Sequence, residues 1–180
     1  MSPSSSWWSR KSCRRVLVSL DQSRINTRKY NLITTMTAAC TPAGFRCLPL
    51  SLVQLSLSAV LKCGQSFRWT SYPISPVCDP STPHAYEYRF CLRDRVVCLR
   101  QSSEALFYRS VFPDGYLDPA QADTREEETL VWLEDYFQLD VDLVKLYDEW
   151  SERDPVFRDF RSRFPGIRIL RQDPWENLIS

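Results

Sequence analysis

Residues 86–111 read YEYRFCLRDRVVCLRQSSEALFYRSV and carry the clearest structural pattern in the chain. Three runs rich in aromatic and β-branched residues alternate with short polar breaks, which is typical of strands joined by tight turns. We predict an antiparallel meander with strands at Tyr86–Leu92, Val96–Gln101 and Ala105–Val111. With the helical patterns that follow it, this meander predicts the α+β class, an antiparallel sheet with helices.

The position of the first turn sets the register of the meander. If Arg93 pairs with Val96 around a turn at Asp94-Arg95, one face of the sheet becomes apolar, as a half-buried sheet requires. That face then holds Tyr88, Phe90, Leu92, Val97 and Leu99.

The same register predicts the second face of the sheet. It places Cys91 opposite Cys98, where we expect a reduced pair rather than a disulfide. It also places Arg89 opposite Arg100. Because facing arginines repel, we expect that face either to be solvated or to lie against an anionic group.

Upstream, the stretch Gly64-Gln65-Ser66-Phe67-Arg68-Trp69 marks a change from a helix-like to a strand-like pattern. Glycine reaches positive φ and lets another group approach the backbone closely. One interpretation is a short helix over Ala59–Cys63, capped by Ser58, with Gly64 as its C′ residue. We predict strands at Ser66–Trp69 and near Gln54–Leu57, and an irregular loop over the proline-rich Tyr72–Pro83.

Downstream of Asp123 the pattern is helical. Thr124 is the expected cap of a helix to Phe137, and Asp140 that of a second helix. The apolar stripe of the second helix is Leu143, Leu146, Tyr147 and Trp150. Asp154-Pro155 begins a third helix, which runs to about Phe164 before Pro165-Gly166, and Asp173-Pro174 begins a fourth. Because the sequence stops within the apolar end of the fourth helix, we expect a truncated, aggregation-prone chain.

Composition excludes several classes of protein. Seven cysteines form no C-x-x-C pair, and His84 is the only histidine. We therefore expect no metal site, no cofactor and reduced thiols. No apolar run approaches the roughly 18 residues of a membrane span, so we expect no membrane association.

Residues 1–43 are rich in Ser, Thr and Arg and nearly free of acids. This composition is typical of an organelle-targeting presequence, with the mitochondrion as the best fit. A disordered basic tail, or an extension upstream of an alternative start at Met36, would have the same composition.

Three motifs occur in an order that resembles the amino-terminal part of eukaryotic 8-oxoguanine DNA glycosylases. They are Gly64–Trp69, then Tyr136–Asp140 with Leu146-Tyr147 and Trp150, then Gly166–Pro174. The resemblance runs from about Phe45 to Ser180. It implies a TATA-binding-protein-like antiparallel sheet domain at 44–123, followed at 124–180 by the first helices of a helix-hairpin-helix glycosylase domain.

The resemblance also implies a role for Gly64. In the family, the backbone carbonyl of this glycine accepts a hydrogen bond from the N7 proton that distinguishes 8-oxoguanine from guanine. Gln65, Ser66 and Phe67 belong to the same motif and are expected to support that carbonyl. We expect Phe67, Trp69, Trp132 and Trp150 to be core residues rather than base-stacking ones. Phosphate contacts by Arg168 and Arg171 are a weaker alternative to ordinary surface arginines.

The family's nucleophile is a lysine near a glycine-rich hairpin, and no such hairpin occurs here. Lys145 lies among acids, which raise an amine's pKa, and nothing beside Lys62 would activate it. We therefore expect no catalytic residue in this chain. The expected function is DNA N-glycosylase and AP lyase action on 8-oxoguanine, with the catalytic lysine and aspartate beyond this chain, which is inactive alone. The alternative is a non-catalytic damaged-DNA-binding or interaction module.

The expected partner is double-stranded DNA containing oxidised guanine. We expect a monomer, in the nucleus or, through the basic extension, in the mitochondrion.

Overall fold

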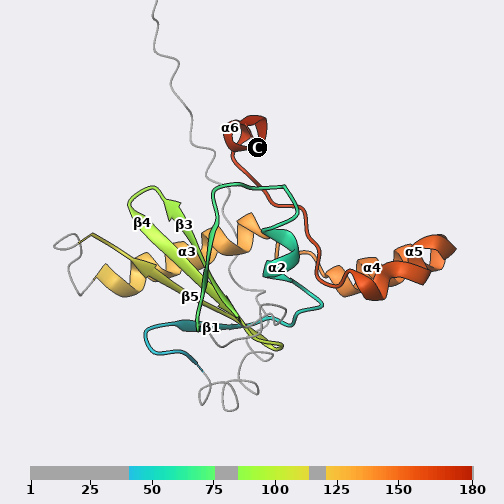
Figure 1. The fold of residues 1–180 in the computed structure, drawn as a ribbon, viewed down its shortest axis with the longest axis horizontal. Coiled ribbons are helices and arrows are strands. Elements are labelled where there is room, and N and C mark those ends of the chain that lie inside the picture. Colours follow the sequence, from blue (N-terminus) through green and yellow to red (C-terminus); the bar gives the residue numbers. More distant parts are fainter. Residues whose placement is uncertain (1–40, 76–84, 114–120, 180) are drawn as a thin grey trace, which may run out of the picture. The chain divides into compact units, whose positions relative to one another are not determined.

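The computed structural model describes residues 41–75, 85–113 and 121–179 (Figure 1). Most of the predicted basic extension, 1–43, lies outside these ranges, as do His84 and residues 76–83 of the predicted Tyr72–Pro83 loop. None of the described helices is long and apolar enough to cross a membrane.

A five-stranded antiparallel sheet forms the centre of the fold, in the order β1-β5-β4-β3-β2. The three strands of the predicted meander are confirmed, and they are the middle three strands of this sheet. The strands are β1 (Arg46–Pro49), β2 (Thr70–Pro73), β3 (Tyr86–Leu92), β4 (Arg95–Gln101) and β5 (Ala105–Val111). Pro73 is tolerated because β2 is an edge strand.

The predicted register of the β3–β4 hairpin is wrong, although the predicted faces are right. Leu92 pairs with Arg95, so the turn is Arg93-Asp94, with Arg93 at φ +52°. Arg95 joins the strand because its side chain, only 7% exposed, donates to the backbone oxygen of Arg125 and to Thr129 Oγ1. Moving the turn by one residue changes each pairing by two, which keeps every side chain on its face.

This shift in the strand register also changes which residues lie opposite each other on the second face of the sheet. Cys91 pairs with Val96, and Arg89 pairs with Cys98. The expected cysteine pair and the expected pair of facing arginines are therefore wrong.

The segment before the sheet differs from its predicted structure. The strand predicted near Gln54–Leu57 is absent. The backbone groups of Leu55 and Leu57 form hydrogen bonds with the side chain of Gln101 instead of with a neighbouring strand. Gln101 Nε2 donates to Leu55 O, and Leu57 N donates to Gln101 Oε1. Helix α2 spans Leu57–Val60 with Ser56 at its N-cap position, so the predicted helix at Ala59–Cys63 capped by Ser58 is also wrong. The following strand begins at Thr70 rather than Ser66.

The four predicted helices all occur, and only the first two begin at other residues than predicted. They are α3 (Ala122–Tyr136), α4 (Leu143–Arg153), α5 (Pro155–Phe160), the short 3-10 helix η4 (Arg161–Arg163) and α6 (Pro174–Ile179). The caps expected from Thr124 and Asp140 are wrong: α3 begins two residues before Thr124, and Asp142 caps α4. Asp154 caps α5, and Asp173 accepts a hydrogen bond from Trp175 N, both as predicted.

The main core lies between α3 and one face of the sheet, which Figure 1 shows crossing each other. Leu133 of α3 and Phe137, the residue that follows this helix, are fully buried with Val97 and Leu99 of β4. An aromatic cluster of Trp69, Phe90, Trp132 and Tyr136 borders this core, with ring centroids 4.8 to 6.5 Å apart. Trp69 and Trp132 are thus packed as predicted. Phe67, 73% exposed, is not. Trp150, 42% exposed, lies outside the main core and packs against Tyr147 and Phe157, with ring centroids 5.7 and 5.5 Å away.

Candidate functional site

Gly64 lies in the loop between α2 and β2 with φ +86°. The positive φ agrees with the sequence, but α2 ends at Val60, so Gly64 is not its C′ residue. Apart from Gly64 and its two chain neighbours, no described residue has an atom within 4 Å of the position that a Cβ would occupy. The backbone at Gly64 therefore faces open space on the side where any other residue would carry a side chain.

Gln65 fixes the loop to the segment that precedes α6. Its Nε2 donates to Arg168 O at 2.8 Å, and its Oε1 accepts from Leu170 N at 3.0 Å. Gln172 Nε2 donates in turn to Gln65 O at 2.6 Å. The side-chain amide of Gln65 thus bonds to the backbone of residues 168 and 170 as a neighbouring strand would. These bonds, with the one to its own backbone oxygen, fix the position of the residue next to Gly64.

Ser66 connects the same loop to α6. Its Oγ donates to Glu176 Oε1 at 2.7 Å, and both residues are at most 5% exposed. Arg68 Nη1 lies 3.3 Å from the other oxygen of Glu176, and Arg68 also stacks over Phe90 at 4.3 Å. A buried carboxylate needs such partners, so the loop and α6 stabilise each other.

Tyr136 of α3 closes this network from the core side. Burial raises its pKa, against hydrogen bonds with Ser66 and Trp69 that lower it. Trp69 Nε1 donates to Tyr136 Oη at 3.1 Å. Phe67 contrasts with these neighbours, because its ring is mostly exposed and can meet a partner.

Arg168 does not fit the phosphate-contact alternative. It is 5% exposed and donates to the backbone oxygens of Gln54, Gln138 and Val141 at 2.5 to 2.9 Å. Burial lowers the pKa of its guanidinium. Arg171 remains more than half exposed and pairs with Asp135 at 2.9 Å.

Sequence reasoning missed Glu176 and Gln172. Glu176 stands in the first turn of a helix, where an acid is usually explained by the helix dipole. Nothing local indicates that its partner is Ser66, more than 100 residues earlier.

The described part of the chain holds two lysines, Lys62 and Lys145. Lys62 lies over the Tyr86 ring at 4.1 Å. Among residues 41–75, 85–113 and 121–179 there is no cluster of three His, Cys, Asp or Glu side chains that could hold a metal ion.

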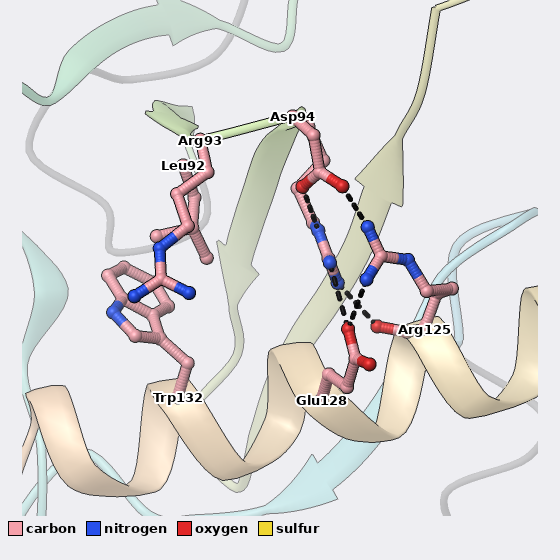
Figure 2. A pocket seen from close by; sticks show the side chains of 7 residues that line it. Leu92, Arg93, Asp94, Arg125, Glu128 and Trp132 are labelled. Carbon is pink, nitrogen blue, oxygen red and sulfur yellow. Dashed lines mark hydrogen bonds and ion pairs between the residues drawn. The ribbon is translucent and has the colours of Figure 1, made fainter. Parts of the chain in front are cut away.

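A hollow of about 520 Å³ lies where the β3–β4 turn meets α3. Figure 2 shows Arg93 and Trp132 on one side of it, and Asp94, Arg125 and Glu128 on the other. Arg125 pairs with Asp94 and with Glu128, and Arg95 pairs with the same two acids. The two arginines and the two acids balance in charge, and their ion pairs hold the β3–β4 turn against α3. We therefore assign these four residues a structural role.

Comparisons with known proteins agree on one family. The family described as 8-oxoguanine DNA glycosylase, N-terminal domain, matches residues 47–178. A curated N-glycosylase/DNA lyase of Saccharomyces cerevisiae is 33% identical over 135 residues, and the match covers 74% of this chain. The N-glycosylase/DNA lyase OGG1 of Arabidopsis thaliana is 28% identical over 134 residues, which is 73% of this chain.

A solved structure, described as MBOgg1 in complex with a low affinity DNA ligand, supports the fold. It aligns with a TM-score of 0.50 and 23% identity, over 74% of this chain and 37% of that one. The two curated matches cover 32% and 31% of the relatives' own lengths. The chain therefore spans about a third of these relatives.

Proposed function

The chain belongs to the family of 8-oxoguanine DNA glycosylase N-terminal domains, and on this premise we propose that it supplies the lesion-recognising part of a DNA glycosylase and AP lyase. In this proposal the Gly64 carbonyl accepts the N7 proton of an extruded 8-oxoguanine. Guanine has an unprotonated acceptor at N7 and cannot donate that bond, which gives the carbonyl its selectivity.

The observation that carries the proposal is the combination of access and rigidity at Gly64. The space beside its backbone is open, while Gln65 and Ser66 on its carboxyl side are fixed by hydrogen bonds. A carbonyl that selects a base by one hydrogen bond must be reachable and must not move. A side chain at position 64 would project into the space that the base needs.

The partner in this proposal is duplex DNA with oxidised guanine, bound by a monomer in the nucleus or the mitochondrion. The domain boundaries predicted after residues 43 and 123 stay a prediction.

Base excision also needs a nucleophile and an activating carboxylate. We propose that residues outside this chain provide both, so that the chain alone recognises but does not excise.

Borohydride trapping on a duplex with one 8-oxoguanine opposite cytosine tests the proposal. Three proteins are compared: the chain, a chimera in which residues 47–178 replace the matched region of the yeast relative, and that chimera with Gly64→Ala. We expect no adduct with the chain and an adduct with the chimera. Gly64→Ala should slow trapping by about tenfold or more, because the base loses its hydrogen bond and meets a methyl group.

Two controls make the result decisive. Circular dichroism and thermal unfolding establish that both chimeras fold, and an abasic-site duplex measures lyase action that needs no base recognition. Equal trapping by the two chimeras on 8-oxoguanine would contradict the role of Gly64. An adduct with the isolated chain would show that one of its own lysines is a nucleophile.

A further inference from the structure

Three arginines lie on the second face of the sheet, the face turned away from α3. They are Arg89 of β3, Arg100 of β4 and Arg109 of β5, and we refer to them as the arginine face. The buried carboxylate of Glu87 lies among them. Arg89 and Arg100 approach it at 2.7 Å, whereas Arg109 approaches only to 3.9 Å. The anionic group expected against the arginines is thus Glu87, a residue that the sequence analysis did not single out.

The arginine face retains excess positive charge. Among the described residues of β1 to β5, Glu87 is the only acid, so one carboxylate is set against three guanidinium groups. Each guanidinium has five N–H donors, and one carboxylate cannot engage them all. Arg109 is the least engaged, because its Nε is buried and has no hydrogen-bond partner among the described residues.

Aromatic rings position the three guanidinium groups. Arg100 and Arg109 both lie over Phe45, each at 4.8 Å from the ring centroid, and Arg89 lies over Tyr72 at 4.4 Å. Their side chains remain 28% to 44% exposed. Stacked arginines of this kind lose little further freedom when they bind an anion.

The spacing of the arginines indicates the size of the ligand. Strands β3 and β5 are two strand spacings apart, which is roughly 10 Å. Three guanidinium groups within that span suit one compact dianion rather than a row of backbone phosphates.

We propose that the arginine face binds a phosphoserine or phosphothreonine side chain of a partner protein. A phosphate monoester carries nearly two negative charges and three strong acceptor oxygens, which match the charge and the donors of this face. Recognition of phosphorylated motifs by arginine clusters is a recurrent mode of peptide binding.

Fluorescence anisotropy at physiological salt tests this proposal with the full 180-residue chain. The probe is a fluorescein-labelled glycine–alanine heptapeptide with a central phosphothreonine. It is compared with the threonine version, with inorganic phosphate as competitor and with a labelled undamaged DNA duplex. Arg109→Gln is the test variant, because the two short ion pairs of Glu87 remain. Arg163→Gln on η4 is the control with the same change of charge.

We expect the phosphopeptide to bind at least tenfold more tightly than the threonine peptide and inorganic phosphate. Arg109→Gln should weaken phosphopeptide binding by about tenfold, and Arg163→Gln by less than twofold. The Nε–H resonances of the three arginines should shift when wild-type chain is titrated with phosphopeptide, a readout that needs no variant.

The proposal is overturned by equal binding of the two peptides, by inorganic phosphate competing as strongly as the phosphopeptide, or by arginine resonances that do not move. Tighter binding of the duplex, lost in Arg109→Gln, would assign the face to nucleic acid instead.

Discussion

Gly166 has much less room than the other left-handed glycines of the described chain. All three have φ between +71° and +86°. A Cβ at Gly166 would lie 2.1 Å from Leu52 O and 2.7 Å from Ser56 N, which are backbone atoms. A Cβ at Gly44 would meet nothing within 4 Å. We expect Gly166→Ala to lower the free energy of unfolding by about 3 kcal/mol or more, and Gly44→Ala by about 1 kcal/mol.

Urea unfolding followed by tryptophan fluorescence measures both variants. The comparison separates crowding from backbone strain, since both substitutions share the strain. Equal losses would mean that the contacts between Gly166 and the turn before α2 contribute little.

The buried hydroxyl of Tyr88 is expected to destabilise the fold. It is buried without a hydrogen-bond partner among the described residues, and burial raises the pKa of Tyr88 to about 12. Removing an unsatisfied hydroxyl while keeping the ring should be favourable. We expect Tyr88→Phe to raise the free energy of unfolding by about 1 kcal/mol, measured by urea unfolding. A loss of stability would reveal a partner for this hydroxyl.

The cap of α4 is an element-scale feature, and it is Asp142 rather than the predicted Asp140. Asp142 accepts from Lys145 N at 3.3 Å and from Gln54 Nε2 at 2.8 Å. We expect Asp142→Ala to lower the free energy of unfolding by about 1 kcal/mol, and the matched Asp140→Ala by less than half of that. Thermal unfolding of the two variants gives the order, and the reverse order would restore Asp140 as the cap.

The sheet depends on pH through Glu87. Burial raises the pKa of this carboxyl, but hydrogen bonds and charges from Arg89 and Arg100 outweigh it, and the net direction is downward. A carboxyl whose pKa is depressed in the folded state stabilises the fold at pH values above the pKa of an unfolded glutamate, which is about 4.3. This stabilisation is lost as the pH falls through the folded pKa.

Glu87→Gln tests this coupling. At pH 7 we expect it to lower the free energy of unfolding by about 2 kcal/mol, since charged hydrogen bonds become neutral ones. The difference from wild type should shrink below pH 4, as urea titrations at pH 7, 5 and 3 would show. Glu152→Gln on α4 provides the control. A difference that is constant with pH would contradict the role of the Glu87 charge.

Elements with strong local patterns were predictable from the sequence. The meander and the Asp154 and Asp173 caps depend on neighbouring residues, and they are confirmed. The β3–β4 register was not predictable, because the burial of Arg95 against α3 sets it. Leu55 and Leu57 likewise looked strand-like, but their hydrogen-bond partner is the Gln101 side chain, which no local rule identifies.

At the scale of the whole molecule, the candidate site is assembled from distant segments. The sequence indicated Gly64 through its motif and its backbone freedom. The groups that fix its loop, Gln172 and Glu176, lie more than 100 residues away and have no local signature. Phe67 was expected in the core because the aromatic pattern does not separate a buried ring from an exposed one.

The exposed apolar surface of α6 gives a prediction about association. Trp175 and Leu178 are 67% and 73% exposed. They lie three residues apart on this helix and therefore share one side of it. Neighbouring exposed apolar side chains favour self-association. We expect the apparent mass of the chain in light scattering to rise with concentration, and Trp175→Gln with Leu178→Gln to restore a monomer. Val131→Gln, at a residue of α3 that is 64% exposed, should leave the association unchanged. A wild-type chain that stays monomeric at every concentration would show that these two side chains do not drive contacts between copies.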